Sequence, residues 1–210
     1  MTITVLLADD HQLVREGLRA LLEIEGFKVV GEAANGEEAR QLAELLCPDV
    51  AVLDLAMPGL NGIEAARKIK QVSPKTRSIL LTVHSDRGYI LEGLRSGATG
   101  YVLKTNAAED LVRAIREVAR GETYLSPEIT DAVVQAYQNN SKIPADPLSA
   151  RERQVLQLIT EGKSTRQVAT TLDISPKTGE TYRTRIMKKL DLHKTADLVR
   201  YAIRQGIVQA

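Results

Sequence analysis

Three aspartates of this sequence follow or end apolar runs that have the length of buried strands. Asp9 and Asp10 come directly after ITVLLA (3–8), and Asp54 lies near the end of DVAVLDL (49–55). Carboxylates that are brought together repel each other, so one of them stays protonated unless a cation compensates the charge. A hard divalent ion does this with oxygen ligands, and Mg²⁺ suits a site with few carboxylates, several waters and a phosphoryl oxygen.

Two further polar residues lie at the ends of similar apolar runs. Thr82 is in RSILLTV (77–83), and Lys104 ends GYVLK (100–104). With a cation on the carboxylates, the Lys104 ammonium and the Thr82 hydroxyl would be available to hold an anion. The pattern indicates a site where a phosphoryl group becomes attached to a carboxylate.

These residues can meet only if the runs before them are neighbouring strands of one sheet. Residues 1–120 alternate five such runs, KVVGEA (28–33) being the second, with helical patterns. This alternation implies right-handed crossovers and a parallel sheet covered on both faces. We expect an α/β, flavodoxin-like, doubly wound domain with five strands in the order 2-1-3-4-5, whose ligands bind beyond the carboxyl ends of the strands. The helical patterns cover residues 12–26, 36–46, 61–72, 87–97 and 107–121.

The rest of the chain differs in pattern and in charge. Residues 148–210 hold 12 Lys and Arg against 6 Asp and Glu, a net charge of +6, whereas residues 1–147 carry −5. Residues 121–147 have the composition of a linker with one helix, at 126–138. We therefore expect a first domain at 1–120, this linker, and a basic second domain at 148–210 that suits nucleic acid.

The second domain shows helical patterns only, so we expect an all-α domain of four helices. Ser149 with Glu152 forms a capping-box pattern, and Ser175 with Pro176 begins a longer basic helix. A short helix, a turn and a longer basic helix are typical of a helix-turn-helix. The four patterns cover residues 149–162, 164–174, 175–190 and 194–206.

Composition excludes several other classes of protein. The single Cys47 rules out an intrachain disulfide and a cysteine-cluster metal site. No apolar run approaches the roughly 18 residues that span a bilayer, and no basic stretch with a long apolar core opens the chain. We expect a cytoplasmic protein without a membrane partner.

The first domain resembles a known family. ADDH, VLDLAMPGLNG, ILLTV and GYVLK occur in the order and spacing of the receiver domain of bacterial two-component response regulators, over residues 1 to about 120. The resemblance implies that Asp54 accepts phosphate from a sensor histidine kinase. It also implies that Asp9 and Asp10 bind Mg²⁺ together with Asp54 and the backbone carbonyl of Ala56.

The same resemblance assigns roles to three residues on the last strands. Lys104 would neutralise phosphoryl charge, and Thr82 and Tyr101 match the switch pair, in which the hydroxyl moves to the phosphate and the ring turns inward. Two positions depart from the family pattern. Ala56 lacks the side chain that tunes phosphate lifetime in many relatives, and Thr105 replaces a proline that often follows the lysine.

The second domain resembles the LuxR-type helix-turn-helix of the NarL/FixJ class, through LSARERQVL, EGKS and the final KKL. The resemblance makes SPKTGETYRTRIMKKL (175–190) the recognition helix. Its basic residues would contact phosphates, while Glu could accept from cytosine N4 and Thr could contact a thymine methyl group. The expected DNA-facing residues are Lys177, Thr178, Glu180, Thr181, Arg183, Thr184, Arg185, Lys188 and Lys189.

Three residues of this helix depart from the family pattern. Gly179 replaces a branched apolar residue, which predicts thinner packing and a cost of about 1 kcal/mol relative to alanine. Tyr182 replaces a histidine, and Glu180 puts negative charge where many relatives have lysine.

Together these features predict a transcription regulator, not an enzyme, that is switched by phosphorylation of Asp54 and dimerises on promoter DNA. One alternative is a DNA-binding protein that ignores phosphate and uses the receiver only to dimerise. A second is an aspartyl-phosphate hydrolase of the haloacid dehalogenase type. Such hydrolases place the second aspartate two positions after the first, whereas Asp9 and Asp10 are adjacent.

Overall fold

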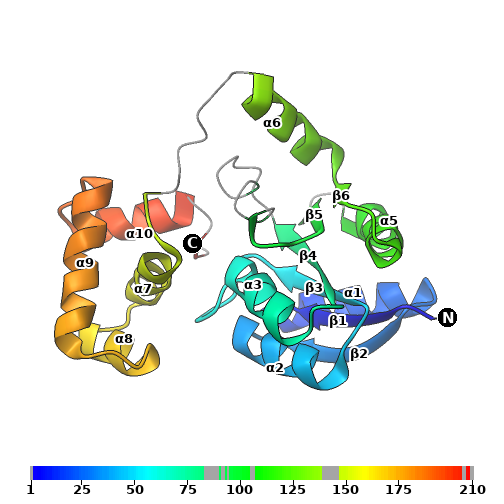
Figure 1. Cartoon of the computed structure of the whole chain (residues 1–210), viewed down its shortest axis with the longest axis horizontal. Coiled ribbons are helices and arrows are strands. Elements are labelled where there is room, and N and C mark those ends of the chain that lie inside the picture. The colour runs from blue at the N-terminus through cyan, green and yellow to red at the C-terminus, as the bar shows by residue number, and fades with distance from the viewer. Residues whose placement is uncertain are drawn as a thin grey trace. The chain divides into compact units, whose positions relative to one another are not determined.

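The computed structural model describes residues 2–82, 90, 93, 95–104, 107–138, 147–204 and 207–208. Contacts within the chain divide it into two compact units, Met1–Ser141 and Lys142–Ala210 (Figure 1). The helix predicted at 87–97 lies largely outside the described residues. Thr105 and most of the predicted linker segment 139–147 also lie outside them.

The first unit is built around a parallel sheet of six strands in the order β2-β1-β3-β4-β5-β6. The order of the first five strands confirms the prediction. The sixth was not predicted, because two residues are too few to show an alternating pattern; it pairs with Gly100 and Tyr101 of β5. The strands are β1 (Thr4–Ala8), β2 (Lys28–Ala33), β3 (Val50–Asp54), β4 (Arg77–Thr82), β5 (Gly100–Leu103) and β6 (Tyr124–Leu125).

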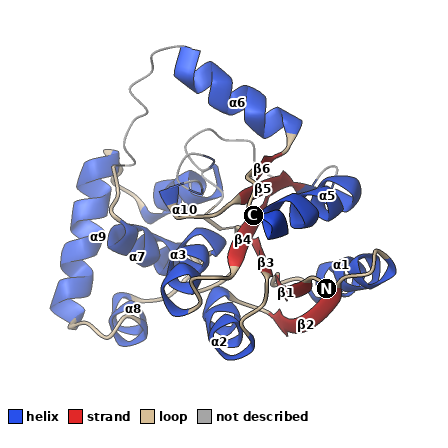
Figure 2. Ribbon diagram, turned by 45° about the vertical axis from the view of Figure 1, so that its right-hand side comes forward, coloured by secondary structure: helices blue, strands red, loops and turns tan. Residues whose placement is uncertain are grey.

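Helices cover both faces of this sheet, with α1 and α5 on one face and α2 and α3 on the other (Figure 2). Asparagines begin two of them. Asn35 accepts a hydrogen bond from the Glu38 backbone N–H, and Asn61 accepts one from the Glu64 N–H, as N-caps do. The helices are α1 (Gln12–Ile24), α2 (Gly36–Leu46), α3 (Gly62–Val72), α5 (Ala107–Arg120) and α6 (Pro127–Gln138).

Strand residues are buried on both faces of the sheet, as expected of near-continuous apolar strands. Val52 packs toward α1 and α5, and its neighbours Ala51 and Leu53 are buried as well. Such strands have a fixed register, because a slip would move polar end residues into the core. The core on the α1 and α5 side includes Val5, Leu7, Leu22, Val50, Val52, Ile79, Leu81, Val102, Leu111, Ile115 and Val118.

The turn between β3 and α3 holds the chain close to the end of β3. The Gly62 N–H donates to the Leu55 carbonyl at 3.0 Å. A Cβ atom on Gly62 would lie 2.3 Å from the backbone oxygen of Asp54, a distance that real side chains do not reach. The final glycine of MPGLNG is therefore required by this close approach to the strand end.

The second unit is helical: α7 (Ala150–Thr160), α8 (Thr165–Thr171), α9 (Pro176–Leu190) and α10 (Thr195–Arg204). The capping box of Ser149 and Glu152 is confirmed, and Ser175 caps α9 through the Thr178 N–H. The core of the unit includes Val155, Leu156, Leu158, Val168, Ile186, Leu198 and Ala202. None of the helices in the described part of the chain has the length and apolar character needed to cross a bilayer.

Replacing Gly62 by alanine should destabilise the first unit by about 1–3 kcal/mol, because the added methyl group overpacks against backbone. Gly17 provides the control: it lies within α1, and a Cβ atom there would meet nothing within 4 Å. Gly17→Ala should stabilise the protein by about 0.5–1 kcal/mol through helix propensity. Urea denaturation followed by far-UV circular dichroism measures both. Equal effects of the two substitutions would contradict the assigned role of Gly62.

Candidate functional site

The predicted acidic residues lie where neighbouring strands end. Asp9 follows β1 and Asp54 is the last residue of β3, and these two strands pair directly. Both residues are buried, with 1% and 2% of their surface exposed, while Asp10 remains partly exposed. The parallel sheet thus brings two carboxylates of distant segments into one buried pocket, with a third at its edge.

Lys104, just beyond β5, supplies the compensating charge. Its Nζ lies 2.7 Å from Asp9 Oδ2 and 2.6 Å from Asp54 Oδ1. From the sequence we expected this ammonium to be available for an anion; in the structure it bridges the two buried carboxylates. Among the described residues, this one ammonium contacts the carboxylates of a cluster that holds three acidic groups, so the cluster is short of positive charge.

Burial and ion pairing act in opposite directions on these groups. Burial raises the pKa of Asp54, and the nearby Lys104 offsets only part of this rise, while Asp9 and Asp10 add to it. Burial lowers the pKa of Lys104, but its ion pairs with Asp54 and Asp9 outweigh this and raise the pKa overall. Lys104 therefore stays protonated. Burial disfavours the charged form of Asp54.

The start of α1 also contributes to the pocket. The His11 N–H donates to Asp9 Oδ1 at 2.9 Å, and the His11 imidazole Nδ1 lies 3.0 Å from Asp10 Oδ1. Arg15 donates to the backbone carbonyl of Asp9 at 2.6 Å. Arg15 was not predicted from the sequence. Its position one helical turn after His11, facing back to the end of β1, is the signal that could have identified it.

The predicted acceptor side chain is held at both oxygens. Asp54 Oδ1 pairs with Lys104, and Oδ2 accepts a hydrogen bond from the Ala56 N–H at 3.2 Å. Because each oxygen has a fixed partner, the carboxylate has one orientation in the pocket.

Thr82 and Tyr101 lie on the two strands that follow β3 in the sheet. Asp54 pairs in register with Leu81, so Thr82 stands one residue beyond it at the same edge. Tyr101, on β5, is fully buried. A Cβ atom at Gly93 would lie 2.7 Å from Tyr101 Cε2, so the ring packs against this glycine. The tyrosine ring thus occupies the inward position in this structure.

The pocket fits a hard divalent cation by its chemistry. Carboxylate oxygens are the ligands that Mg²⁺ prefers, and Lys104 alone leaves them short of positive charge. Ligand atoms of Asp9, Asp10 and His11 lie within 4.8 Å of one another. The imidazole is a softer ligand than Mg²⁺ prefers, so the aspartates are the better ligands of this group.

The recognition helix predicted at 175–190 is α9, and Gly179 and Ile186 form its buried side. The expectation of thin packing at Gly179 is wrong. A Cβ atom there would lie 3.2 Å from Thr165 Cγ2 and 3.4 Å from the Thr165 backbone oxygen, so the glycine lets α8 and α9 approach closely. Tyr182, on the same helix, is half-buried.

The basic residues of α9 fall into two groups. Arg183 donates to the Thr195 hydroxyl at 2.8 Å, and Lys189 Nζ lies 2.7 Å from Glu152 Oε2, a carboxylate that is 5% exposed. Burial raises the pKa of Glu152, but hydrogen bonds from Lys189 and Ser149 outweigh this and lower the pKa. Arg185 and Lys188 are exposed, and neither has a hydrogen bond or ion pair with another described residue.

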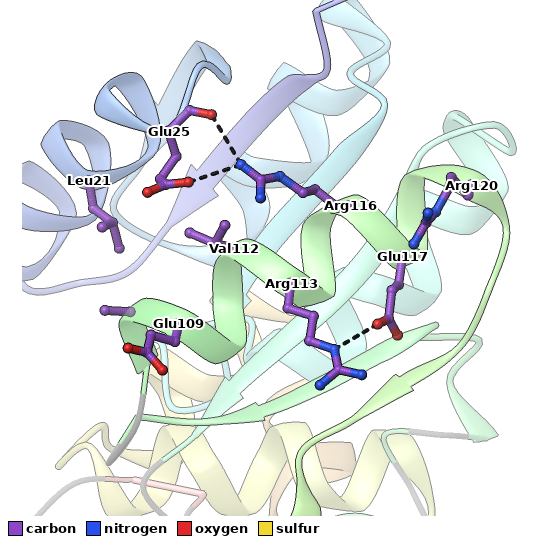
Figure 3. Close-up of a pocket in the computed structure, with 9 residues that line it drawn as sticks. Leu21, Glu25, Glu109, Val112, Arg113, Arg116, Glu117 and Arg120 are labelled. Carbon is purple, nitrogen blue, oxygen red and sulfur yellow. Dashed lines mark hydrogen bonds and ion pairs between the residues drawn. The ribbon is translucent and has the colours of Figure 1, made fainter.

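A hollow of about 360 Å³ lies apart from the pocket, between α1 and α5 (Figure 3). Its floor includes Leu21 and Val112, and charged side chains form its rim. Arg116 donates to the Glu25 carboxylate at 2.9 Å, and Arg113 donates to Glu117 at 2.8 Å. Two of the rim arginines are thus paired with rim carboxylates, and none of the predicted site residues lines the hollow.

The chain thus joins an α/β domain with a buried acidic pocket to a helical domain with a helix-turn-helix, the two parts of a DNA-binding regulator. Comparison with known families agrees. Residues 5–116 match the "Response regulator receiver domain", and residues 146–202 match "Bacterial regulatory proteins, luxR family". The chain belongs to the two-component response regulators that carry a LuxR-type DNA-binding domain, and it acts on transcription.

Relatives match over nearly the whole chain. "Response regulator UvrY" of Escherichia coli strain K12 is 40% identical over 211 residues, covering 99% of this chain and 97% of the relative. "Response regulator GacA" of Pseudomonas aeruginosa is 39% identical over 213 residues, covering 99% of both. These relatives place the chain among DNA-binding transcription regulators and not among hydrolases.

A solved structure is similar to this chain over nearly its whole length. RcsB from Salmonella enterica serovar Typhimurium, bound to promoter rprA in the presence of the phosphomimetic BeF3⁻, is 26% identical. It has a TM-score of 0.70 and covers 96% of this chain and 98% of its own. Structural comparison thus agrees with the α/β receiver and helical DNA-binding domain seen here.

Replacing Asp54 by asparagine should stabilise the first unit at neutral pH, because burial raises the pKa of Asp54 and the neutral amide does not carry the buried charge. The folded-state pKa of Asp54 is raised, so the penalty for holding the charged carboxylate is fully present above that pKa. The penalty disappears as the pH falls toward the unfolded-state pKa of about 3.9, and the gain of the variant should shrink with it. Free energies of unfolding between about pH 4 and pH 8, without Mg²⁺, measure this difference.

Asp131→Asn, at an exposed position of α6, is the control and should change stability little at any pH. A loss of stability in Asp54→Asn at neutral pH would show that the ion pair with Lys104 outweighs the cost of burial.

Proposed function

We propose that Asp54 accepts a phosphoryl group from a sensor histidine kinase and that this modification controls DNA binding by the second domain. The observation that carries the proposal is the position of the Asp54 carboxylate. It is buried at a sheet edge, oriented at both oxygens, and lies 2.6 Å from the Lys104 ammonium. A carboxylate oxygen would bond to phosphorus as the bond to the donor histidine breaks.

The other pocket residues would support this transfer. Asp9, Asp10, Asp54 and the Ala56 carbonyl would hold Mg²⁺, which supplies positive charge for the phosphoryl oxygens. Lys104 already contacts both buried carboxylates, so its ammonium needs little displacement to reach a group attached to Asp54. Its raised pKa keeps it charged for this role.

Thr82 and Tyr101 would report the modification to the rest of the receiver. A hydroxyl one residue beyond the register partner of Asp54 can donate to a phosphate on Asp54. Once the Thr82 hydroxyl contacts the phosphate, the buried position of the Tyr101 ring beside Gly93 would be favoured. Phosphorylation would thereby shift an existing two-state equilibrium through a local change in charge.

The second domain would bind promoter DNA through α9, and the phosphorylated chain would do so as a homodimer on half-sites about one helical turn apart. Arg185 and Lys188, with Lys177, offer exposed cations for phosphate contacts. Arg183 and Lys189 would contribute mainly by fixing α9 to Thr195 and Glu152, and by adding positive charge near the DNA. Thr178, Glu180, Thr181 and Thr184 would lie toward the bases.

Asp54→Asn should abolish labelling of the protein by acetyl phosphate in the presence of Mg²⁺, because the neutral amide cannot replace the carboxylate as the nucleophile. Asp131→Asn should be labelled like the wild type. Acid-labile phosphate measured on intact protein by mass spectrometry gives the result. Labelling that persists in Asp54→Asn would show that another residue is the acceptor.

Promoter affinity then decides between switched and unswitched regulation. The wild type should bind promoter DNA more tightly after phosphorylation, and Asp54→Ala should show no such gain. Equal affinity of the phosphodonor-treated wild type and Asp54→Ala would favour a regulator whose receiver only dimerises.

Two adjacent lysines of α9 should separate DNA contact from domain stability. Lys188→Met should lower the slope of log affinity against log salt concentration by about 1 without affecting folding, because it removes one phosphate contact. Lys189→Met should destabilise the domain by about 1 kcal/mol, because the largely buried Glu152 carboxylate loses its ion pair with Lys189. The effect stays small because Lys189 is itself partly exposed to solvent. Salt titrations of DNA binding and thermal denaturation measure the two effects. Identical behaviour of the two variants would contradict the division of roles.

A further inference from the structure

One face of α9 points away from the domain. Gly179 and Ile186 are buried on the inner side. Residues at spacings of four, three and four lie along the opposite side of a helix with 3.6 residues per turn. We call this side the outward stripe. It consists of Lys177, Thr181, Thr184 and Lys188, all of which are exposed.

The two threonines at the centre of the outward stripe use their hydroxyl protons within the helix. The Thr181 hydroxyl donates to the Lys177 carbonyl at 2.9 Å, and the Thr184 hydroxyl donates to the Glu180 carbonyl at 3.0 Å. A hydroxyl has one proton, so neither group has a donor left for a ligand. The bond also fixes the rotamer, with the oxygen against the backbone and the methyl group directed elsewhere.

The chemistry of the stripe therefore changes along its length. Its two ends carry ammonium groups separated by about 16 Å, from 11 residues at a rise of about 1.5 Å. Its centre offers methyl groups and acceptor lone pairs only. Beside the centre, Glu180 adds an exposed carboxylate, which is also an acceptor.

We infer that Thr181 and Thr184 are specificity-determining residues that read thymine methyl groups at the central base pairs of each half-site. This inference rests on the proposed function, since it requires α9 to lie in the major groove. Guanine presents two acceptors in that groove and needs a donor, which the centre of the stripe lacks. Thymine presents a methyl group, and its partner adenine presents an amino donor that the free lone pairs and Glu180 can accept. A G·C pair also presents an amino donor, on cytosine, but it has no methyl group. A·T pairs therefore match the centre of α9 better because of the thymine methyl group, and guanine fits the lysine ends.

The test begins with selection of DNA bound by the full-length, phosphodonor-treated protein from a random pool. Each selected central thymine is then replaced by deoxyuridine, which removes only the methyl group. Wild-type affinity should fall about fourfold per methyl group, the effect of losing one buried carbon from an apolar contact. Replacement of thymines outside the selected positions is the control on the DNA.

Matched protein variants identify the reading atom. Thr181→Ser and Thr184→Ser keep the hydroxyl and lose the methyl group, so they should bind thymine and uracil DNA equally. Thr181→Val and Thr184→Val lose the hydroxyl and keep the branched carbon, so they should retain the preference for thymine. Circular dichroism verifies that these exposed substitutions leave the fold intact.

Different results would overturn this inference and the proposed function. Binding to DNA that is indifferent to thymine methyl groups, or a preference for thymine that survives in the serine variants, would overturn this inference alone. Failure of the wild type to select any DNA would overturn the proposed function and this inference with it.

Discussion

The Lys104 ammonium between Asp9 and Asp54 is the interaction on which the receiver depends. Two carboxylates that are almost completely buried cannot both be charged in a pocket of low polarity without a nearby cation. Lys104 satisfies part of this requirement and leaves a net negative pocket with Asp10 at its edge. That remaining charge makes the site suitable for a divalent cation and, through it, for a phosphoryl group.

The rest of the receiver fixes this unfavourable arrangement in place. Strands that are apolar on both faces set the register, so their polar ends emerge at one edge of the sheet. Gly62 allows the following helix to approach the Asp54 backbone, and Arg15 holds the backbone carbonyl of Asp9. The stability of the core thereby offsets the cost of concentrating charge at this edge of the sheet, as is common at functional sites.

In the DNA-binding unit, α9 exposes basic side chains on one side and is fixed to the rest of the unit on the other. Ion pairing of Lys189 with the buried Glu152 and the hydrogen bond of Arg183 to Thr195 use two of its cations for attachment. The close contact at Gly179 brings α8 against α9. What remains on the exposed side is a short pattern of charges, methyl groups and acceptors.

The sequence by itself determined the features that depend on local pattern. Alternating strands and helices gave the order of five strands, and the polar residues after them gave the pocket, because parallel strands end at one edge. Ser149 and Ser175 marked helix starts, since a cap acts within one turn. Only the tertiary structure decided the contacts between distant segments. The partner of Lys104 lies 95 residues away in Asp9, and that of Lys189 lies 37 residues away in Glu152. Strand β6, the role of Arg15 and the tight packing at Gly179 belong to this second group, because periodicity and capping contain no information about which surfaces meet.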